Sequence, residues 1–198
     1  PQGLGRRQRQ MCIRDRTKPG STALCPVPAV LVSCGVEKAN IITLAWVGTV
    51  CSEPPAVSIS VRPDRFSHGL IVESGEFVVN IPRADQVAVV DYCGQVSGRD
   101  VDKWTECGLT EAPANKVRTP LIAECPVALE CRVTHQLTLG THDLYIGEVL
   151  SVQADEEMLD DNGRLDPGRA GLLAYVGGFY WRLGGKLGRY GDWRAGSG

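Results

Sequence analysis

Short apolar runs recur along the chain and predict β-strands. Each run is four to nine residues long, most are rich in β-branched residues, and residues 57–61 alternate strictly between apolar and polar positions. This alternation is typical of a strand with one buried face. The predicted strands are residues 29–34, 41–45, 57–61, 76–81, 127–133, 136–139 and 144–152.

Turn-forming residues separate these runs. Gly35, Asn40 and residues 53–55 (Glu-Pro-Pro) interrupt the first three. Residues 140–143 predict a hairpin loop, and residues 162–163 (Asn-Gly) predict a tight turn in a polar excursion after the last strand. The segment 97–124 is expected to be mostly irregular.

Helical patterns are fewer. Residues 66–74 place Phe66, Leu70 and Ile71 on one face, with Asp64 as a candidate N-cap and a glycine stop directly after the segment. A second helix is predicted over residues 83–95, where Val87 and Val90 share a face, and a single turn over residues 101–107. About seven strands against two short helices favour a closed or nearly closed antiparallel barrel.

Composition narrows the class of protein. The 198 residues are 43% hydrophobic and 22% charged, which suits one folded domain. Residues 1–16 carry a net charge of +4, so the rest of the chain carries −6. That acidic body argues against nucleic-acid binding. We expect residues 1–18 to be a non-native or disordered basic leader, because residues 11–16 (MCIRDR) resemble translated adaptor sequence, and residues 19–198 to be the domain.

The eight cysteines have no C-x-x-C spacing, and the three histidines have no metal-ligand spacing, so no metal site is predicted. We expect Cys34, Cys51, Cys125 and Cys131 to be small buried hydrophobes in a reducing compartment. No apolar run reaches the ~20 residues of a membrane span. The reducing compartment that the cysteines imply makes a cytoplasmic protein the expectation. The carboxylates of residues 155–161 are interpreted as a solvated loop.

Residues 62–68 (RPDRFSH) suggest an anion site. The N-terminus of a helix presents free N–H groups and a favourable dipole, and Arg62, Arg65 and Ser67 would add charge and a hydroxyl. The alternative is ordinary capping by Asp64 with solvent-exposed arginines. Residues 171–198 contain nine glycines and five Tyr or Trp residues, so this tail is expected to pack against something, a partner subunit being one candidate.

Several blocks together resemble the flavin reductase-like, FMN-binding split-barrel proteins, nearest to the flavoredoxin branch. The blocks that carry the resemblance are residues 26–34, 40–46 (NIITLAW), 54–61 (PPAVSISV), 65–70, 75–82 (GEFVVNIP), 97–104 (SGRDVDKW), 142–149 (HDLYIGEV) and 178–184 (GFYWRLG). The resemblance implies a mainly β fold, a six-stranded antiparallel Greek-key split barrel with a few flanking helices. It also implies a homodimer with FMN near the interface.

The resemblance also implies site residues. Those expected to line the isoalloxazine ring are Thr43, Leu44, Ala45 and Trp46. Those expected at the phosphate and ribityl chain are Ser60, Arg62, Arg65, Phe66, Ser67 and His68. Asn80, Lys103 and Tyr175 are expected near the flavin, and Cys93 lies near the site by pattern as a buried thiol.

The resulting hypothesis is an FMN-binding oxidoreductase without a side-chain catalyst. Its first form is an NAD(P)H:flavin reductase that passes hydride to FMN and on to a small acceptor. The alternative is a flavoredoxin-like electron carrier with a redox protein partner. A third class is a flavin-free β-barrel binding module. Neither nucleic acid nor membrane is an expected partner.

Overall fold

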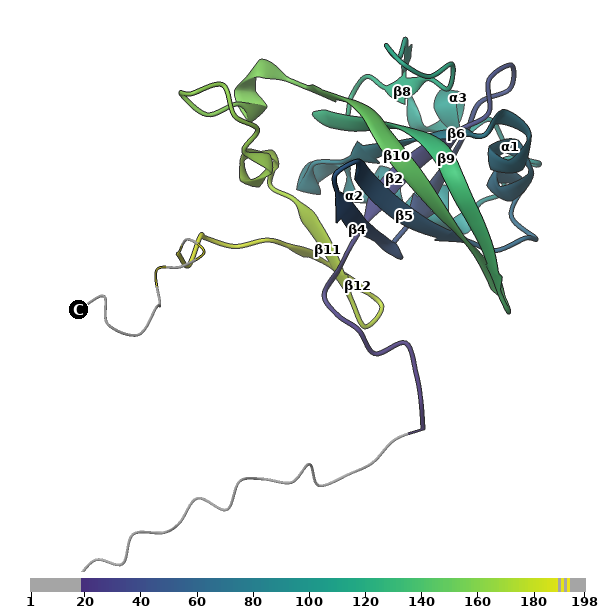
Figure 1. Ribbon diagram of the computed structural model, residues 1–198, viewed down its shortest axis with the longest axis horizontal. Helices are drawn as coiled ribbons and strands as arrows, with labels where there is room; N and C mark the ends of the chain where they lie inside the picture. Colours follow the sequence, from purple (N-terminus) through teal and green to yellow (C-terminus); the bar gives the residue numbers. More distant parts are fainter. Residues whose placement is uncertain (1–18, 189, 191, 193–198) are drawn as a thin grey trace, which may run out of the picture.

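A computed structural model of the protein describes residues 19–188, 190 and 192. Its centre is an antiparallel sheet of seven strands in the order β3-β2-β6-β9-β10-β5-β4. The strands are β2 (Val30–Cys34), β3 (Asn40–Leu44), β4 (Val47–Ser52), β5 (Pro55–Val61), β6 (Glu76–Ile81), β9 (Val127–Leu139) and β10 (His142–Ala154). The two edge strands of this order, β3 and β4, follow each other in the sequence, so the sheet curls into a barrel (Figure 1).

The predicted split-barrel class is confirmed, with one more strand than the six expected. Strand β3 ends at Leu44 and β4 begins at Val47, so one bent stretch of chain supplies both edges. The Ser60 amide donates to the Trp46 carbonyl at 3.0 Å and ties this bend to β5. No sequence pattern predicts β4, because its residues 48–52, which are exposed, lack an apolar alternation.

The interior of the barrel is apolar. Its core residues come from both edges and from the long strands, and include Ile59, Phe77 and Tyr145, each at most 1% exposed. Helix α1 (Phe66–Ser74) inserts Ile71 into this cluster. The predicted helix therefore has the predicted bounds, and its apolar residues 70 and 71 face the barrel.

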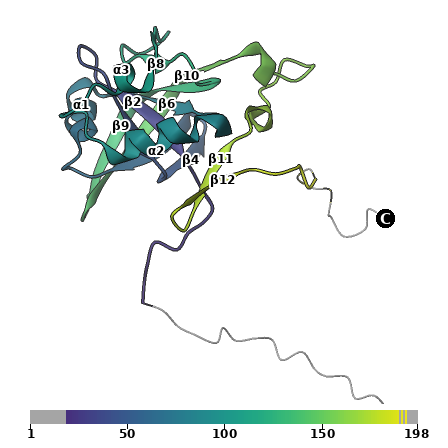
Figure 2. The ribbon, with the colours of Figure 1, turned by 180° about the vertical axis from the view of Figure 1, so that it is seen from behind.

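Helices cover the outside of the barrel next to β3 (Figure 2). The 3-10 turn η1 (Ala84–Gln86) leads into α2 (Val87–Gln95), and α3 (Lys103–Cys107) follows a short loop. Val90 and Cys93 of α2 pack with Ile41 and Trp104 in a second apolar cluster. The predicted helix over 83–95 is thus confirmed, with a 3-10 first turn. The small strands β7 (Glu111–Ala112) and β8 (Leu121–Ile122) pair with each other, and Ile122 joins the second apolar cluster.

The predicted strands 127–133 and 136–139 form one strand, β9. Thr134 is an extra residue between the pairs Val133–Gly147 and His135–Ile146, so the polar interruption in the sequence is a β-bulge and not a strand end. The predicted hairpin loop shortens to Gly140 and Thr141, because β10 already begins at residue 142.

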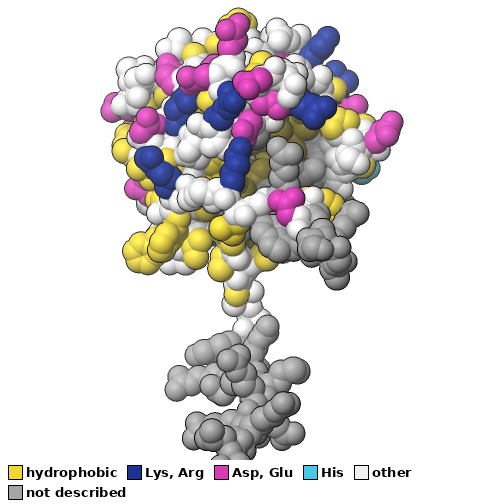
Figure 3. Space-filling model, turned by 90° about the vertical axis from the view of Figure 1, so that its left-hand side faces the viewer, with side chains coloured by type: hydrophobic (Ala, Val, Ile, Leu, Met, Phe, Trp, Pro, Cys, Tyr) yellow, Lys and Arg dark blue, Asp and Glu magenta, His cyan; other side chains and the backbone are white. Residues whose placement is uncertain are grey.

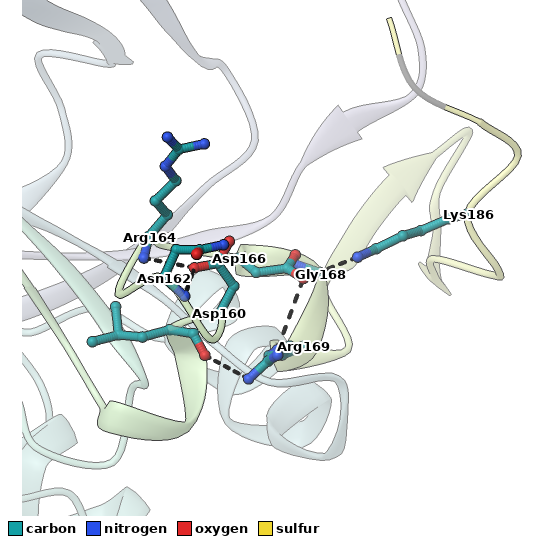
Figure 4. Close-up of polar contacts among 8 residues, drawn as sticks. Asp160, Asn162, Arg164, Asp166, Gly168, Arg169 and Lys186 are labelled. Atoms are coloured by element: carbon teal, nitrogen blue, oxygen red, sulfur yellow. Dashed lines mark hydrogen bonds and ion pairs between the residues drawn. The ribbon is translucent and has the colours of Figure 1, made fainter. Parts of the chain in front are cut away.

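The acidic excursion after β10 is held by its own side chains. It contains the 3-10 turns η2 (Glu156–Met158) and η3 (Pro167–Ala170). The Asp160 carboxylate accepts from the amides of Asn162 and Arg164, which forms the predicted tight turn, and Asp166 pairs with Lys186 at 2.9 Å (Figure 4). At the start of the excursion, Arg83 pairs with Asp155 and Glu157. Asp155 and Glu157 are exposed, and they act as structural partners of Arg83.

Strands β11 (Leu173–Val176) and β12 (Phe179–Arg182) form a hairpin near the C-terminal end of the described chain, and this hairpin pairs with the short strand β1 (Val27–Pro28). Tyr175 and Tyr180 pack against the second apolar cluster, the one that contains Val90 and Cys93 of α2. These two aromatic residues of the tail therefore pack within this chain. Phe179 and Trp181 remain 69% and 57% exposed. Figure 3 shows hydrophobic side chains gathered at the lower edge of one face, at the height of this hairpin in Figure 1.

Candidate functional site

A groove runs along β3 between the N-terminus of α1 and the C-terminus of α2. Its central pocket has a volume of about 130 Å³. This pocket shares Ile42, Arg65 and Gly94 with a second pocket beside β5, and shares Asn40, Phe66 and Lys103 with a wider one of about 370 Å³. The shared walls make the three pockets one continuous groove.

The first turn of α1 opens into the groove without a cap. Arg65 occupies the N-cap position and makes no side-chain hydrogen bond to the helix. The alternative of capping by Asp64 is wrong, because its carboxylate pairs with Arg62 at 3.3 Å. The N–H groups of the first turn and the positive end of the helix dipole therefore face the space lined by Arg65, Phe66 and Ser67, an arrangement that favours an anion.

A buried cation lines the same groove. Lys103 is 3% exposed, and its ammonium donates to the Ile41 carbonyl at 2.7 Å and the Cys93 carbonyl at 2.8 Å. An ammonium has three donors, so one N–H is left beyond these two bonds. Burial lowers the pKa of Lys103 below its ordinary value, and the nearby Arg65 guanidinium lowers it further. The two cations thus raise the local positive potential together.

Arg99 adds a third positive charge to the central pocket. Its guanidinium donates to the Asp64 carbonyl at 2.9 Å and lies 5.8 Å from the centroid of the Phe66 ring. Only one carboxylate, that of Asp64, lines this pocket among the described residues. On a chain of net charge −2, this local excess of positive charge marks a place for an anionic ligand.

The backbone approaches the groove closely at a glycine. A Cβ on Gly98 would meet Asn40 Oδ1 at 2.1 Å and Phe66 Cδ1 at 2.9 Å. The Asn40 amide is itself fixed, because it donates to Ser67 Oγ at 2.8 Å. The loop after α2 therefore seats against β3 and α1 only with glycine at this position.

The end of β3 forms the other half of the groove. Thr43, Leu44, Ser60 and Arg62 line it, and Thr43 Oγ1 donates to the Val90 carbonyl, which fixes β3 to α2. Ala45 and Trp46 continue the chain at the bend between β3 and β4. The Trp46 ring, 45% exposed, lies 4.5 Å from the ring of His142, which lines the groove. An aromatic surface therefore borders the opening.

The structure thus brings together most of the predicted site residues. Those lining the groove are Thr43, Leu44, Ser60, Arg62, Arg65, Phe66, Ser67 and Lys103. His68 instead points to Asp143, whose carboxylate accepts from His68 Nε2 at 2.8 Å. This hydrogen bond is the main cause that lowers the pKa of Asp143. His68 therefore braces α1 against β10.

Asn80 lies outside the groove, contrary to expectation. Strand alternation puts it on the outer face of β6 with Val78, opposite Phe77 and Val79, which face the barrel core. Its amide is fully buried, donates to Ser33 Oγ and accepts from the Ile122 amide.

Tyr175 is also absent from the described groove lining. It packs on Tyr180 with ring centroids 5.5 Å apart, within the β11–β12 hairpin.

Sequence reasoning missed several residues that line the groove. They are Asn40, Ile42, Gly94, Val96, Ser97, Gly98, Arg99 and His142. Gly98 and Arg99 belong to the SGRDVDKW block. A glycine followed by an arginine, just after a predicted helix, was the sequence pattern that could have indicated them. The expectation that Cys51 is buried is wrong: it is exposed on β4, whereas Cys34, Cys125 and Cys131 are buried as expected.

In residues 19–188 and the two further described positions, no group of three or more potential ligand side chains is arranged to hold a metal ion. The same part of the chain has no helix long and apolar enough to cross a bilayer.

Comparison with known proteins agrees with this geometry. The pattern of the family described as flavin reductase like domain matches residues 22–181. Flavoredoxin of Desulfovibrio vulgaris (Miyazaki F) is 31% identical, with a TM-score of 0.83 over 89% of this chain and 97% of the other. A flavoredoxin from Methanosarcina acetivorans is 31% identical, with a TM-score of 0.82 over 90% and 96%. An FMN-binding protein from Thermus thermophilus is 30% identical, with a TM-score of 0.72 over 84% and 92%.

Proposed function

Because the chain belongs to the flavin reductase-like domain family, we propose that it is an FMN-dependent oxidoreductase that holds the flavin in the groove along β3. The main support is the uncapped first turn of α1, which opens beside Arg65 into a groove whose wall contains the buried Lys103. Likeness to flavoredoxins and to a protein described as FMN-binding supports the same ligand.

The phosphate is assigned to the N-terminus of α1. The amides of the first turn would donate to it, and Arg65 would add charge-assisted hydrogen bonds. Ser67 accepts from Asn40, which orients the hydroxyl and leaves its proton free to donate. Arg62 already pairs with Asp64 at 3.3 Å and contributes less. This division makes Arg65 the main phosphate anchor.

The isoalloxazine ring is assigned to the end of β3, beside residues 43–46. FMN bound there would supply the two-electron redox chemistry of the proposed reaction. Lys103 holds a positive charge at the groove wall, where it would stabilise negative charge that develops on reduction. Trp46 and His142 would shield the ring edge from water.

The proposed electron donor is NAD(P)H, and the proposed acceptor is a small molecule. The runner-up is an electron carrier with a redox protein partner, and 31% identity to two flavoredoxins favours keeping it. Stopped-flow mixing of the flavin-loaded chain with NADH and with NADPH separates the two. Fast bleaching of the flavin by either nucleotide supports the reductase, whereas slow bleaching that a redox partner accelerates supports the carrier.

A homodimer completes the proposal. Phe179, Trp181 and Leu183 leave an apolar surface on and after β12 that a second copy could cover. The competing class, a flavin-free binding module, predicts a colourless protein that does not quench FMN fluorescence.

A further inference from the structure

Two thiols meet where α2 and α3 enclose the groove. Cys93 lies in the last turn of α2 and lines the central pocket, and Cys107 is the last residue of α3. Their sulfurs are 3.8 Å apart. Cys93 is 1% exposed and Cys107 is half-buried, so a reagent from solvent can reach only the second sulfur directly. Neither the proposed flavin chemistry nor the barrel core requires a pair of thiols here.

We propose that Cys93 and Cys107 form a reversible intramolecular disulfide that links α2 to α3 at the flavin groove. A disulfide has a sulfur–sulfur distance near 2.05 Å, so the two sulfurs must approach by about 1.8 Å. Rotation of the half-exposed Cys107 side chain and a small shift of the five-residue α3 can supply this movement, because α3 sits at the surface.

The pair has an attacking and a resolving member. Burial above all, together with the charge on and the hydrogen bond to Cys107, raises the pKa of Cys93 to about 12. Burial also raises the pKa of Cys107 above its ordinary value, but here the same hydrogen bond and the Lys103 ammonium oppose the rise. The Cys107 thiolate is therefore the one that forms first, and it is also the one that solvent reaches.

The oxidant is a small organic disulfide. The Cys107 thiolate attacks one of its sulfurs, which forms a mixed disulfide and releases the first thiol. Cys93, after losing its proton, then attacks Cys107 Sγ and expels the second thiol. The protein thiols lose two electrons, the reagent gains them, and the two protons end on the two released thiols.

Closure of this bond acts on the groove through Lys103. This residue precedes Cys107 by one helical turn, and its ammonium is bound to the Cys93 carbonyl at 2.8 Å. Drawing α2 and α3 together must shift that contact and the adjacent Gly94, both in the groove wall. This consequence rests on the proposed flavin site, whereas formation of the disulfide does not.

The test treats the folded full-length chain with oxidised glutathione and digests it with trypsin under non-reducing conditions. The peptides 84–99 and 104–116 contain one cysteine each, Cys93 and Cys107. We expect a linked pair of these peptides that dithiothreitol separates, formed faster at pH 9 than at pH 7. Cys107→Ser must abolish the linked species, and the control Cys51→Ser, which removes an exposed thiol, must leave it unchanged.

Linear peptides only, or glutathione retained on Cys107, would overturn the disulfide. FMN titration of the reduced and oxidised chains then tests the coupling. We expect affinity to differ about tenfold, the scale of one charge-assisted hydrogen bond, in the unmodified chain and not in Cys107→Ser. Equal affinities with the disulfide formed would overturn the coupling. A chain that forms the disulfide but binds no FMN contradicts the proposed function and leaves the disulfide standing.

Discussion

The ammonium of Lys103 donates to the carbonyl of Ile41 at 2.7 Å, which fixes a buried cation against β3 in the wall of the groove. A lysine buried to this degree must gain from its partners, since burial disfavours its charge. Its hydrogen bonds to two backbone carbonyls offset part of the cost of burying the charge, and a bound anion would accept the third N–H of the ammonium.

Replacing Lys103 by methionine should make the flavin harder to reduce. The change keeps the apolar stem and removes the charge, so we expect the midpoint potential to fall by about 30 mV for each tenfold loss in preference for the reduced form. Equilibration with reference dyes measures it. In the unmodified chain this effect should fade as pH rises through the lowered pKa of Lys103, because the ammonium then loses its proton. A pH-independent offset between the two proteins would contradict the role of the charge.

Gly98→Ala should destabilise the protein by about 1–3 kcal/mol, since a new methyl group would overlap Asn40 and Phe66. Relief of the overlap must break the Asn40–Ser67 hydrogen bond or move the Phe66 ring. Urea unfolding measures the change. Gly48→Ala is the matched control, because a Cβ there meets nothing within 4 Å, and it should change stability by less than about 0.5 kcal/mol.

Glu130→Gln should destabilise the protein by about 1–3 kcal/mol near pH 7. Glu130 is fully buried and accepts from the Lys116 amide and from Gln153 Nε2. Burial alone would raise the pKa of Glu130, but these hydrogen bonds outweigh it and the pKa lies below its ordinary value of 4.5.

The stability from Glu130 is therefore present above pH 4.5 and is lost as pH falls through the lowered pKa. Urea unfolding of both proteins between pH 7 and pH 3 checks it. The difference between them should narrow toward the acid end, and a constant difference would show that the ionised carboxylate is not what matters.

Phe179→Glu and Trp181→Glu should shift the proposed dimer toward monomer. Both side chains are more than half exposed on the β11–β12 hairpin, and aromatic anchors of interfaces cost about 2 kcal/mol or more when lost, or over tenfold in dissociation constant. Sedimentation equilibrium measures the shift. Leu139→Glu, an equally exposed apolar site on the β9–β10 hairpin, should leave the assembly unchanged.

The sequence predicts the strands with buried faces well, because their apolar spacing is dictated by the barrel core. It misses β4, whose side chains face solvent and carry no alternation. It also splits β9 at Thr134, where a bulge accommodates a polar residue without ending the strand. Both errors arise where pairing by backbone hydrogen bonds, and not burial, decides the structure.

The site residues divide in the same way. Residues next to one another in sequence, such as Arg65 and Ser67, reach the groove together because one helix start carries them. Asn80 and Tyr175 do not, because which face a strand residue occupies depends on neighbours distant in sequence. Arg99 could not be assigned from its spacing, since a loop brings it back over Phe66.

The phosphate site at the first turn of α1 is tested most directly by titrating the purified full-length chain with FMN and with riboflavin. We predict saturable FMN binding with a visible flavin spectrum, and weaker binding of riboflavin, which lacks the phosphate. Arg65→Ala should weaken FMN by about 10–100-fold and leave riboflavin nearly unchanged, as expected for loss of charged hydrogen bonds. Arg118→Ala, an exposed arginine paired with Glu76 away from the groove, should change neither. Equal affinity for the two flavins, unaffected by Arg65→Ala, would contradict the assignment, and a chain that binds neither would contradict the proposed function itself.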